Sequence, residues 1–238
     1  MTEKKKQGGV NHLYKLLYQY EDEGEKAYTL PRVTNEHSTG DMLMDEYLGG
    51  GYGRPNAYEI VMIFGDTGSN KSTLSTQLIL NPAFKGKQIA IFALEDDVVD
   101  VYTRIRRQSL SFGAGKFDDP MVAMRKISKS IWMAPDSDGY TLEAMALEIE
   151  SLFTTGTDIV VVDPLQFIFE ASVVEKTETE FNRQRLFMRQ INNMMKRVAR
   201  ETGKSKTIIL VSHTNKGRYE SAMDNIMGSG ANKQVPTK

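Results

Sequence analysis

The feature that most restricts the fold of this chain is a glycine-containing loop between a short apolar run and a helical pattern. Residues 59–64 (EIVMIF) predict a buried strand, and leucines at helical spacing follow residue 73. Such a unit binds phosphate, because loop glycines let backbone N–H groups point inward and the helix N-terminus adds positive potential. The loop residues expected to contact a nucleotide are Gly65, Asp66, Thr67, Gly68, Ser69, Asn70, Lys71, Ser72 and Thr73.

Two side chains of this loop have chemical roles of their own. Lys71 is expected to contact the β- and γ-phosphates of ATP, and the Ser72 hydroxyl is expected to ligate Mg²⁺. Asn70 stands where the usual pattern has a glycine before the lysine, but asparagine tolerates positive φ better than most residues. We therefore expect the loop to keep its shape. The alternative interpretation is an ordinary strand-to-helix turn.

Strands and helices alternate through the rest of the chain. Further strands are predicted over 88–94, 129–134, 159–162 and 207–211, and helices over 97–112, 140–153 and 180–202. We expect Asn81-Pro82 to end the helix that begins after the loop, and Trp132 to lie in the core. Because the strands are continuously apolar, the predicted fold class is α/β, with a mostly parallel sheet and helices on both faces.

Three polar residues at the ends of predicted strands are candidates for chemistry. Asp163 follows residues 159–162 (IVVV) and is placed to hold Mg²⁺ through water. Glu95 follows the second strand, where a carboxylate can polarise an attacking water; the alternative is an acid favoured by a helix N-terminus. His213 follows the last strand and is placed to contact the γ-phosphate; the alternative is a hydrogen-bonded structural histidine.

The charge balance excludes a global electrostatic attraction to nucleic acid. Lys plus Arg total 30 and Asp plus Glu total 31, so the net charge is −1 and any nucleic-acid contact must be local. The candidate is a short basic loop with one aromatic residue, formed by Lys216, Arg218 and Tyr219. The alternative is a solvated turn. The chain has no cysteine, which excludes disulfides and cysteine zinc sites.

The N-terminal region is expected to stand apart from the rest of the chain. Residues 1–10 have a disordered composition, and residues 11–20 predict a short helix that packs on its own domain or docks on a neighbouring subunit. The predicted division is a flexible arm over 1–37 and a core over 38–238. The basic N-terminus lacks the apolar stretch of a signal peptide, so we expect a cytoplasmic protein.

The motifs together resemble the RecA-like P-loop ATPases and, within them, the hexameric replicative helicase family of DnaB-like, phage primase-helicase and RepA-type enzymes. The similar motifs, in chain order, are Ser38-Thr39-Gly40 with Leu48 to Gly51, the phosphate loop, Leu94-Glu95 with Arg104, Asp163-Pro164-Leu165, Val211-Ser212-His213, and Gly228-Ser229-Gly230-Ala231 with Gln234. The resemblance implies a RecA-like ATPase core over 38–238, with Glu95 as catalytic base and His213 as sensor of the γ-phosphate.

The same resemblance implies what the core acts on. Its last motif faces DNA at the centre of a ring, so Ser229 and Gly230 join Lys216 and Arg218 as expected nucleic-acid contacts. The implied protein is a hexameric helicase or translocase that couples Mg-ATP hydrolysis to movement on single-stranded nucleic acid, DNA more than RNA. The alternatives are a RecA-like recombinase, a helicase-loading ATPase, or a switch that hydrolyses ATP slowly or not at all.

Overall fold

The computed structural model describes residues 35–114, 116–134, 141–166 and 180–213, which all lie within one compact unit, Asn35–Lys238. The described residues form one sheet of five strands in the order β1-β5-β4-β2-β3, and every neighbouring pair is parallel. The strands are β1 (Tyr58–Gly65), β2 (Ile89–Ala93), β3 (Ile131–Met133), β4 (Ile159–Asp163) and β5 (Lys206–His213). The predicted parallel sheet is therefore confirmed.

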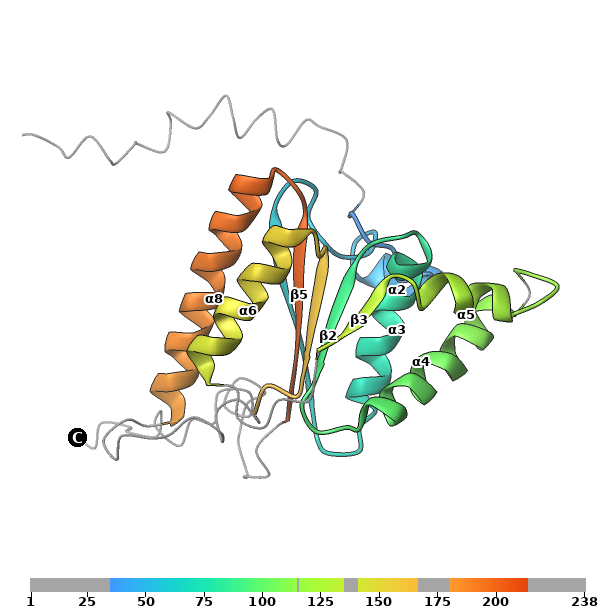
Figure 1. Ribbon diagram of the computed structural model, residues 1–238, viewed down its shortest axis with the longest axis horizontal. Helices are drawn as coiled ribbons and strands as arrows, with labels where there is room; N and C mark the ends of the chain where they lie inside the picture. Colours follow the sequence, from blue (N-terminus) through green and yellow to red (C-terminus); the bar gives the residue numbers. More distant parts are fainter. Residues whose placement is uncertain (1–34, 115, 135–140, 167–179, 214–238) are drawn as a thin grey trace, which may run out of the picture. The chain divides into compact units, whose positions relative to one another are not determined.

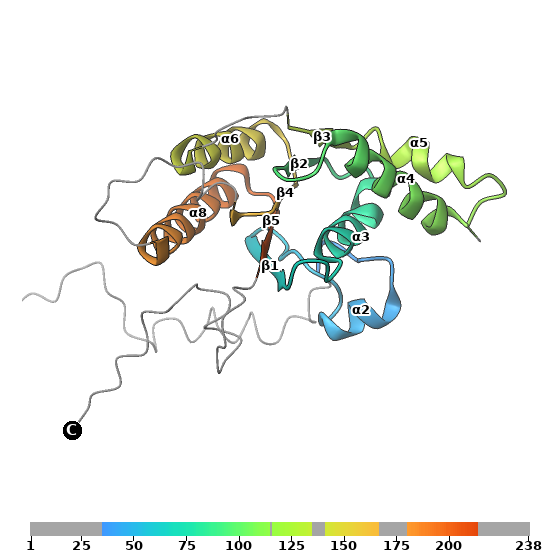
Figure 2. The ribbon, with the colours of Figure 1, turned by 90° about the horizontal axis from the view of Figure 1, so that it is seen from below.

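Helices cover both faces of this sheet (Figure 1, Figure 2). One face carries α6 (Leu142–Thr155) and α8 (Glu180–Thr202), and the other carries α3 (Lys71–Phe84) and α4 (Val98–Gly113). Along β4, Val160 and Val162 pack with α6 and α8, whereas Ile159 and Val161 pack with α3 and α4. Both faces of the strand are buried, which explains its continuously apolar sequence. None of the helices described here is both long and apolar enough to cross a membrane.

Two short helices are not predicted from the sequence, α2 (Met42–Tyr47) and α5 (Met121–Ile127). No residue of α2 is buried, so the helix carries no apolar stripe that a periodicity could reveal. With seven residues, α5 makes about two turns, which is shorter than the window over which helical periodicity becomes distinct.

The lead-in segment, residues 35–57 before β1, is organised around Asp45 of α2. The hydroxyls of Ser38 and Thr39 donate hydrogen bonds to its carboxylate at 2.6 and 2.7 Å. The backbone N–H groups of Gly50 and Gly51 donate to its carbonyl oxygen at 2.7 and 3.1 Å. Asp45 therefore holds Ser38 and Thr39 close to Gly50 and Gly51, which gives the motif formed by residues 38–40 and 48–51 a structural role.

The expectation that Asn81-Pro82 ends the helix after the phosphate loop is wrong, because α3 continues through Pro82 to Phe84. A proline inside a helix has no N–H to donate to the carbonyl four residues earlier, which here belongs to Leu78. The hydroxyl of Tyr52, which is 3% exposed, donates to that carbonyl at 2.8 Å instead. The proline is tolerated because a side chain from the lead-in segment supplies the missing donor.

The expectation that Trp132 lies in the core is also wrong, since 63% of it is exposed. It lies on β3, the edge strand, opposite Ala90 of β2. The helices that bury Ala90 are α6 and α8, and the cluster they form does not include Trp132. Its indole N–H donates to the Gln88 side chain at 3.1 Å. An apolar three-residue strand predicts burial only when a helix covers it.

Within the lead-in segment, the buried His37 pairs with Tyr52. His37 and Tyr52 exchange two backbone hydrogen bonds, each of 2.8 Å, in an isolated antiparallel bridge. His37 is 2% exposed, and neither ring nitrogen has a partner in the described part of the chain. Burial, with Lys87 nearby, lowers the pKa of His37 to about 4. The division between arm and core at this residue stays a prediction.

We expect the stability of the fold to depend on pH through His37. Its folded pKa lies below the ordinary value of 6.5, so the unfolded chain binds the extra proton between these pH values. The free energy of unfolding should therefore decrease as pH falls from 6.5 towards 4, by about 3 kcal/mol in all. Urea unfolding of the wild type and His37→Gln at several pH values measures the effect. A difference between the two that stays constant over this range would contradict it.

Candidate nucleotide site

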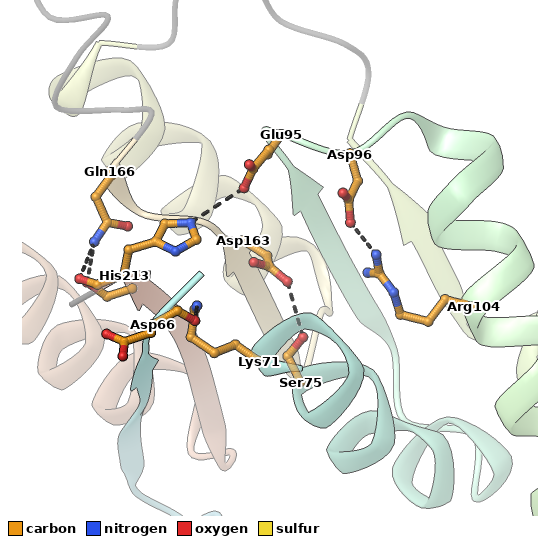
Figure 3. A network of polar contacts seen from close by, with 10 residues as sticks. Asp66, Lys71, Ser75, Glu95, Asp96, Arg104, Asp163, Gln166 and His213 are labelled. Carbon is orange, nitrogen blue, oxygen red and sulfur yellow. Dashed lines mark hydrogen bonds and ion pairs between the residues drawn. The ribbon is translucent and has the colours of Figure 1, made fainter. Parts of the chain in front are cut away.

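Parallel strands bring the predicted site residues to one edge of the sheet, where β1, β2, β4 and β5 end (Figure 3). In the register of the sheet Gly65 lies beside His213, and Ala93 lies beside Asp163. The N–H of Leu94 donates to the carbonyl oxygen of Asp163 at 2.8 Å, which fixes the chain just before Glu95. Residues far apart in the sequence thus meet at the carboxyl edge, where open α/β sheets bind ligands.

The phosphate loop has the backbone shape that the sequence predicts. Asn70 lies in the left-handed region with φ 62° and ψ 28°, so the expected tolerance of asparagine for positive φ is confirmed. Gly68 also has positive φ, 81°. A Cβ on Gly65 would lie 2.7 Å from the Ser69 hydroxyl oxygen, so a larger residue here would require the Ser69 side chain to move. The buried Lys71 donates from Nζ to the Asp66 carbonyl at 2.8 Å, which folds the loop back on itself.

The N-terminus of α3 is open to an anion. Side chains of Asp41, Asp97 and Thr141 cap α2, α4 and α6 by accepting a backbone N–H, but Asn70 makes no such bond to α3. The first N–H groups of a helix have no partner within the helix and carry positive potential. In α3 these donors face the end of the phosphate loop, as a phosphate-binding helix requires.

Asp163 lies behind the loop, beside the first turn of α3. Burial raises the pKa of its carboxyl group, although a hydrogen bond with Ser72 and the nearby Arg104 act in the opposite direction. The Ser75 hydroxyl also donates to Asp163 Oδ2 at 3.3 Å. Mg²⁺ prefers hard oxygen ligands, and a hydroxyl beside a carboxylate is such a donor set. Ser72 and Asp163 therefore fit the metal role that the sequence predicts for them.

Glu95 and His213 face each other across the edge of the sheet (Figure 3). The Glu95 Oε2 atom lies 3.5 Å from Nε2 of His213, and about half of the glutamate side chain is exposed. Nδ1 of His213 is buried and has no partner in the described part of the chain. The neighbouring Asp96 forms an ion pair with Arg104 of α4, the arginine of the predicted second motif. Of these two acids that follow β2, Asp96 is thus paired with an arginine, whereas Glu95 contacts His213.

The structure adds Gln166, which the sequence does not single out. Its side-chain amide donates to the Ser212 hydroxyl at 2.6 Å and to the His213 carbonyl oxygen at 3.0 Å. The only sequence signal is its place three residues after Asp163, at the same edge of the sheet. The predicted nucleic-acid contacts Lys216, Arg218, Ser229 and Gly230, and the arm with its helix 11–20, lie outside the described residues.

Comparison with known protein families assigns this fold and site. A family model described as an AAA domain matches residues 52–219, which is more than half of the 238-residue chain. The matched range contains the phosphate loop, Glu95, Asp163 and His213. The chain therefore belongs to the AAA domain family of nucleotide-binding proteins. No curated protein sequence matches it.

Solved structures with a similar fold include an ATPase domain and a replicative helicase. The ATPase domain of G40P is 18% identical, with a TM-score of 0.60, over 90% of this chain and 77% of that one. A DnaB-like replicative helicase, solved in a study of its interactions with primase, is 16% identical with the same TM-score. That match covers 85% of this chain and 49%, or about half, of the helicase chain. The predicted RecA-like fold is thereby confirmed.

Proposed function

We propose that this chain is the motor core of a ring-forming ATPase that couples Mg-ATP hydrolysis to movement along single-stranded nucleic acid. The observation that carries the proposal is a set of groups that meet at one sheet edge: the phosphate loop, an acid beside its serine, and a glutamate that faces a histidine. The family assignment supports hydrolysis of ATP, and the likeness of fold to an ATPase domain and to a DnaB-like replicative helicase favours the helicase class.

Each side chain has a role in the proposed reaction. Lys71 would exchange its hydrogen bond with the Asp66 carbonyl for contacts with the β- and γ-phosphates. Ser72 and Asp163 would hold Mg²⁺, which neutralises phosphate charge when it is bound. Glu95 would orient the attacking water and accept its proton, and His213 would contact the γ-phosphate. Because Glu95 and His213 now face each other, nucleotide that binds between them would compete with their contact.

The proposed assembly is a homo-oligomer, expected to be a hexamer, whose nucleotide sites lie between subunits. The segments around 166–180 and 215–234 are the proposed nucleic-acid contacts, and Lys216, Arg218, Ser229 and Gly230 are the residues concerned. DNA is the expected substrate, and a residue such as Arg218 would complete the site of a neighbour.

The rate of ATP hydrolysis with and without single-stranded DNA tests this proposal, with Lys71→Ala as the blank. We expect the strand to raise the wild-type rate about tenfold, which corresponds to ~1.4 kcal/mol of barrier. Lys71→Ala should hydrolyse no ATP under either condition. Duplex DNA and single-stranded RNA of the same length serve as matched polyanions, and light scattering with nucleotide measures the assembly.

Each other outcome favours a specific alternative. Tight ATP binding with negligible turnover and no response to the strand would favour a switch. Open filaments on the strand would favour a recombinase-like protein. A monomer at micromolar concentration, with nucleotide and DNA both present, would contradict the ring.

A further inference from the structure

Beyond the sheet pairing, little holds the end of β4 to the end of β5. Paired residues of the two strands end at Val162 and Leu210, whereas β5 continues to His213 along β1. After that point, one backbone hydrogen bond joins the described residues that follow β4 to β5, from the Leu165 N–H to the Val211 carbonyl at 2.7 Å. Among the described residues, the side chain of Gln166 supplies further bonds from the end of β4 to the end of β5.

The Gln166 amide is a two-point clamp on the residues it contacts. Its Nε2 group donates to the Ser212 hydroxyl oxygen at 2.6 Å and to the His213 carbonyl oxygen at 3.0 Å. The Ser212 side chain is buried, and Gln166 itself is partly buried, so water competes poorly for these bonds. On the side opposite β1, the clamp therefore adds a second restraint on the backbone from which the His213 ring extends towards Glu95 (Figure 3).

We propose that Gln166 is a positioning residue, which acts on hydrolysis by holding His213 in line with Glu95 and the nucleotide. The inference rests on the proposed function of this site, because it assigns Gln166 a role through His213. When a group at an active site is displaced by about 1 Å, the rate of the reaction can fall about a hundredfold. Without the Gln166 clamp, the bond between Leu165 and Val211 remains on the β4 side of the end of β5. We expect His213 then to move and the rate of hydrolysis to fall.

Gln166→Ala is expected to lower kcat for ATP hydrolysis by about 10- to 100-fold, with the KM for ATP changed by less than about threefold. The phosphate loop and Asp163 lie on other elements and keep their contacts, so nucleotide binding should persist. Gln190→Ala is the matched control, because Gln190 is exposed on α8 and lies outside the site. Thermal unfolding of both variants separates a loss of rate from a loss of fold.

A double-mutant cycle with His213→Ala tests whether Gln166 acts through the histidine. If it does, Gln166→Ala should have no further effect on kcat once His213 is absent. Additive losses from the two substitutions would overturn the proposal.

Gln166→Glu provides a readout that a merely structural role would not change. The ionised glutamate cannot donate to the His213 carbonyl, whereas the protonated form carries one O–H donor. The activity of this variant relative to wild type should therefore rise as pH falls towards the pKa of the new carboxyl group. A ratio that is flat with pH would contradict the clamp. A wild type that hydrolyses no ATP would instead contradict the proposed function.

Discussion

Glu95→Gln is expected to reduce kcat for ATP hydrolysis by about 10²- to 10⁴-fold and to leave ATP affinity within a few fold. The amide keeps the size of the side chain but cannot accept the proton of the attacking water. About half of the Glu95 side chain is exposed and, among the described residues, its side chain contacts His213, so the thermal midpoint should change little. Single-turnover hydrolysis measures the chemical step, and a fluorescent ATP analogue measures binding.

Glu148→Gln is the matched control, since it makes the same chemical change at an exposed position on α6. Hydrolysis that survives in Glu95→Gln would assign the proton acceptor to another group. A parallel loss of ATP binding would instead indicate that Glu95 supports the shape of the site, as the helix-terminus interpretation of this residue implies.

Asp163→Asn is expected to abolish Mg-dependent hydrolysis and, at the same time, to stabilise the nucleotide-free protein. Burial raises the pKa of Asp163 in the fold, so above that pKa the ionised carboxylate costs stability, which a neutral amide avoids. The hydrolysis rate should fall by at least about a hundredfold. The thermal midpoint without Mg²⁺ should rise, by about 2–4 °C for each kcal/mol in a domain of this size.

The stability difference between wild type and Asp163→Asn should depend on pH. As pH falls through the raised pKa of Asp163, the wild-type carboxylate takes up a proton and its cost to stability disappears. The difference in thermal midpoint between the two proteins should therefore become smaller in acid. Asp118→Asn, an exposed loop residue, should show neither effect. A variant less stable than wild type near neutral pH would show that the bonds with Ser72 and Ser75 outweigh the cost of burial.

The sequence predicts the sheet of this protein well because burial on both faces leaves a continuous apolar run. The runs at 159–162 and 207–211 lie inside β4 and β5, and the loop after β1 has the expected φ at Asn70. The failures occur where a distant residue decides the local structure. Tyr52 lets α3 continue through Pro82, and Trp132 is exposed because no helix in the described part of the chain covers it.

The candidate site follows the same division. Five site residues are predictable because each belongs to a motif next to a strand end, and parallel strands end at one edge of the sheet. They are Lys71, Ser72, Asp163, Glu95 and His213. Gln166 belongs to no such pattern. Its contacts with Ser212 and His213 join positions 46 and 47 residues apart, so only the register of the folded sheet reveals them.

The proline in α3 also bears on the order in which this protein assembles. In an uninterrupted helix the Leu78 carbonyl would find its donor one turn away, as soon as the helix forms. Here its donor is Tyr52, 26 residues earlier in the chain, so the bond requires a loop to close first. Non-local contacts of this kind form more slowly than helical turns. We therefore expect the last turns of α3 to become stable only after the lead-in segment has docked.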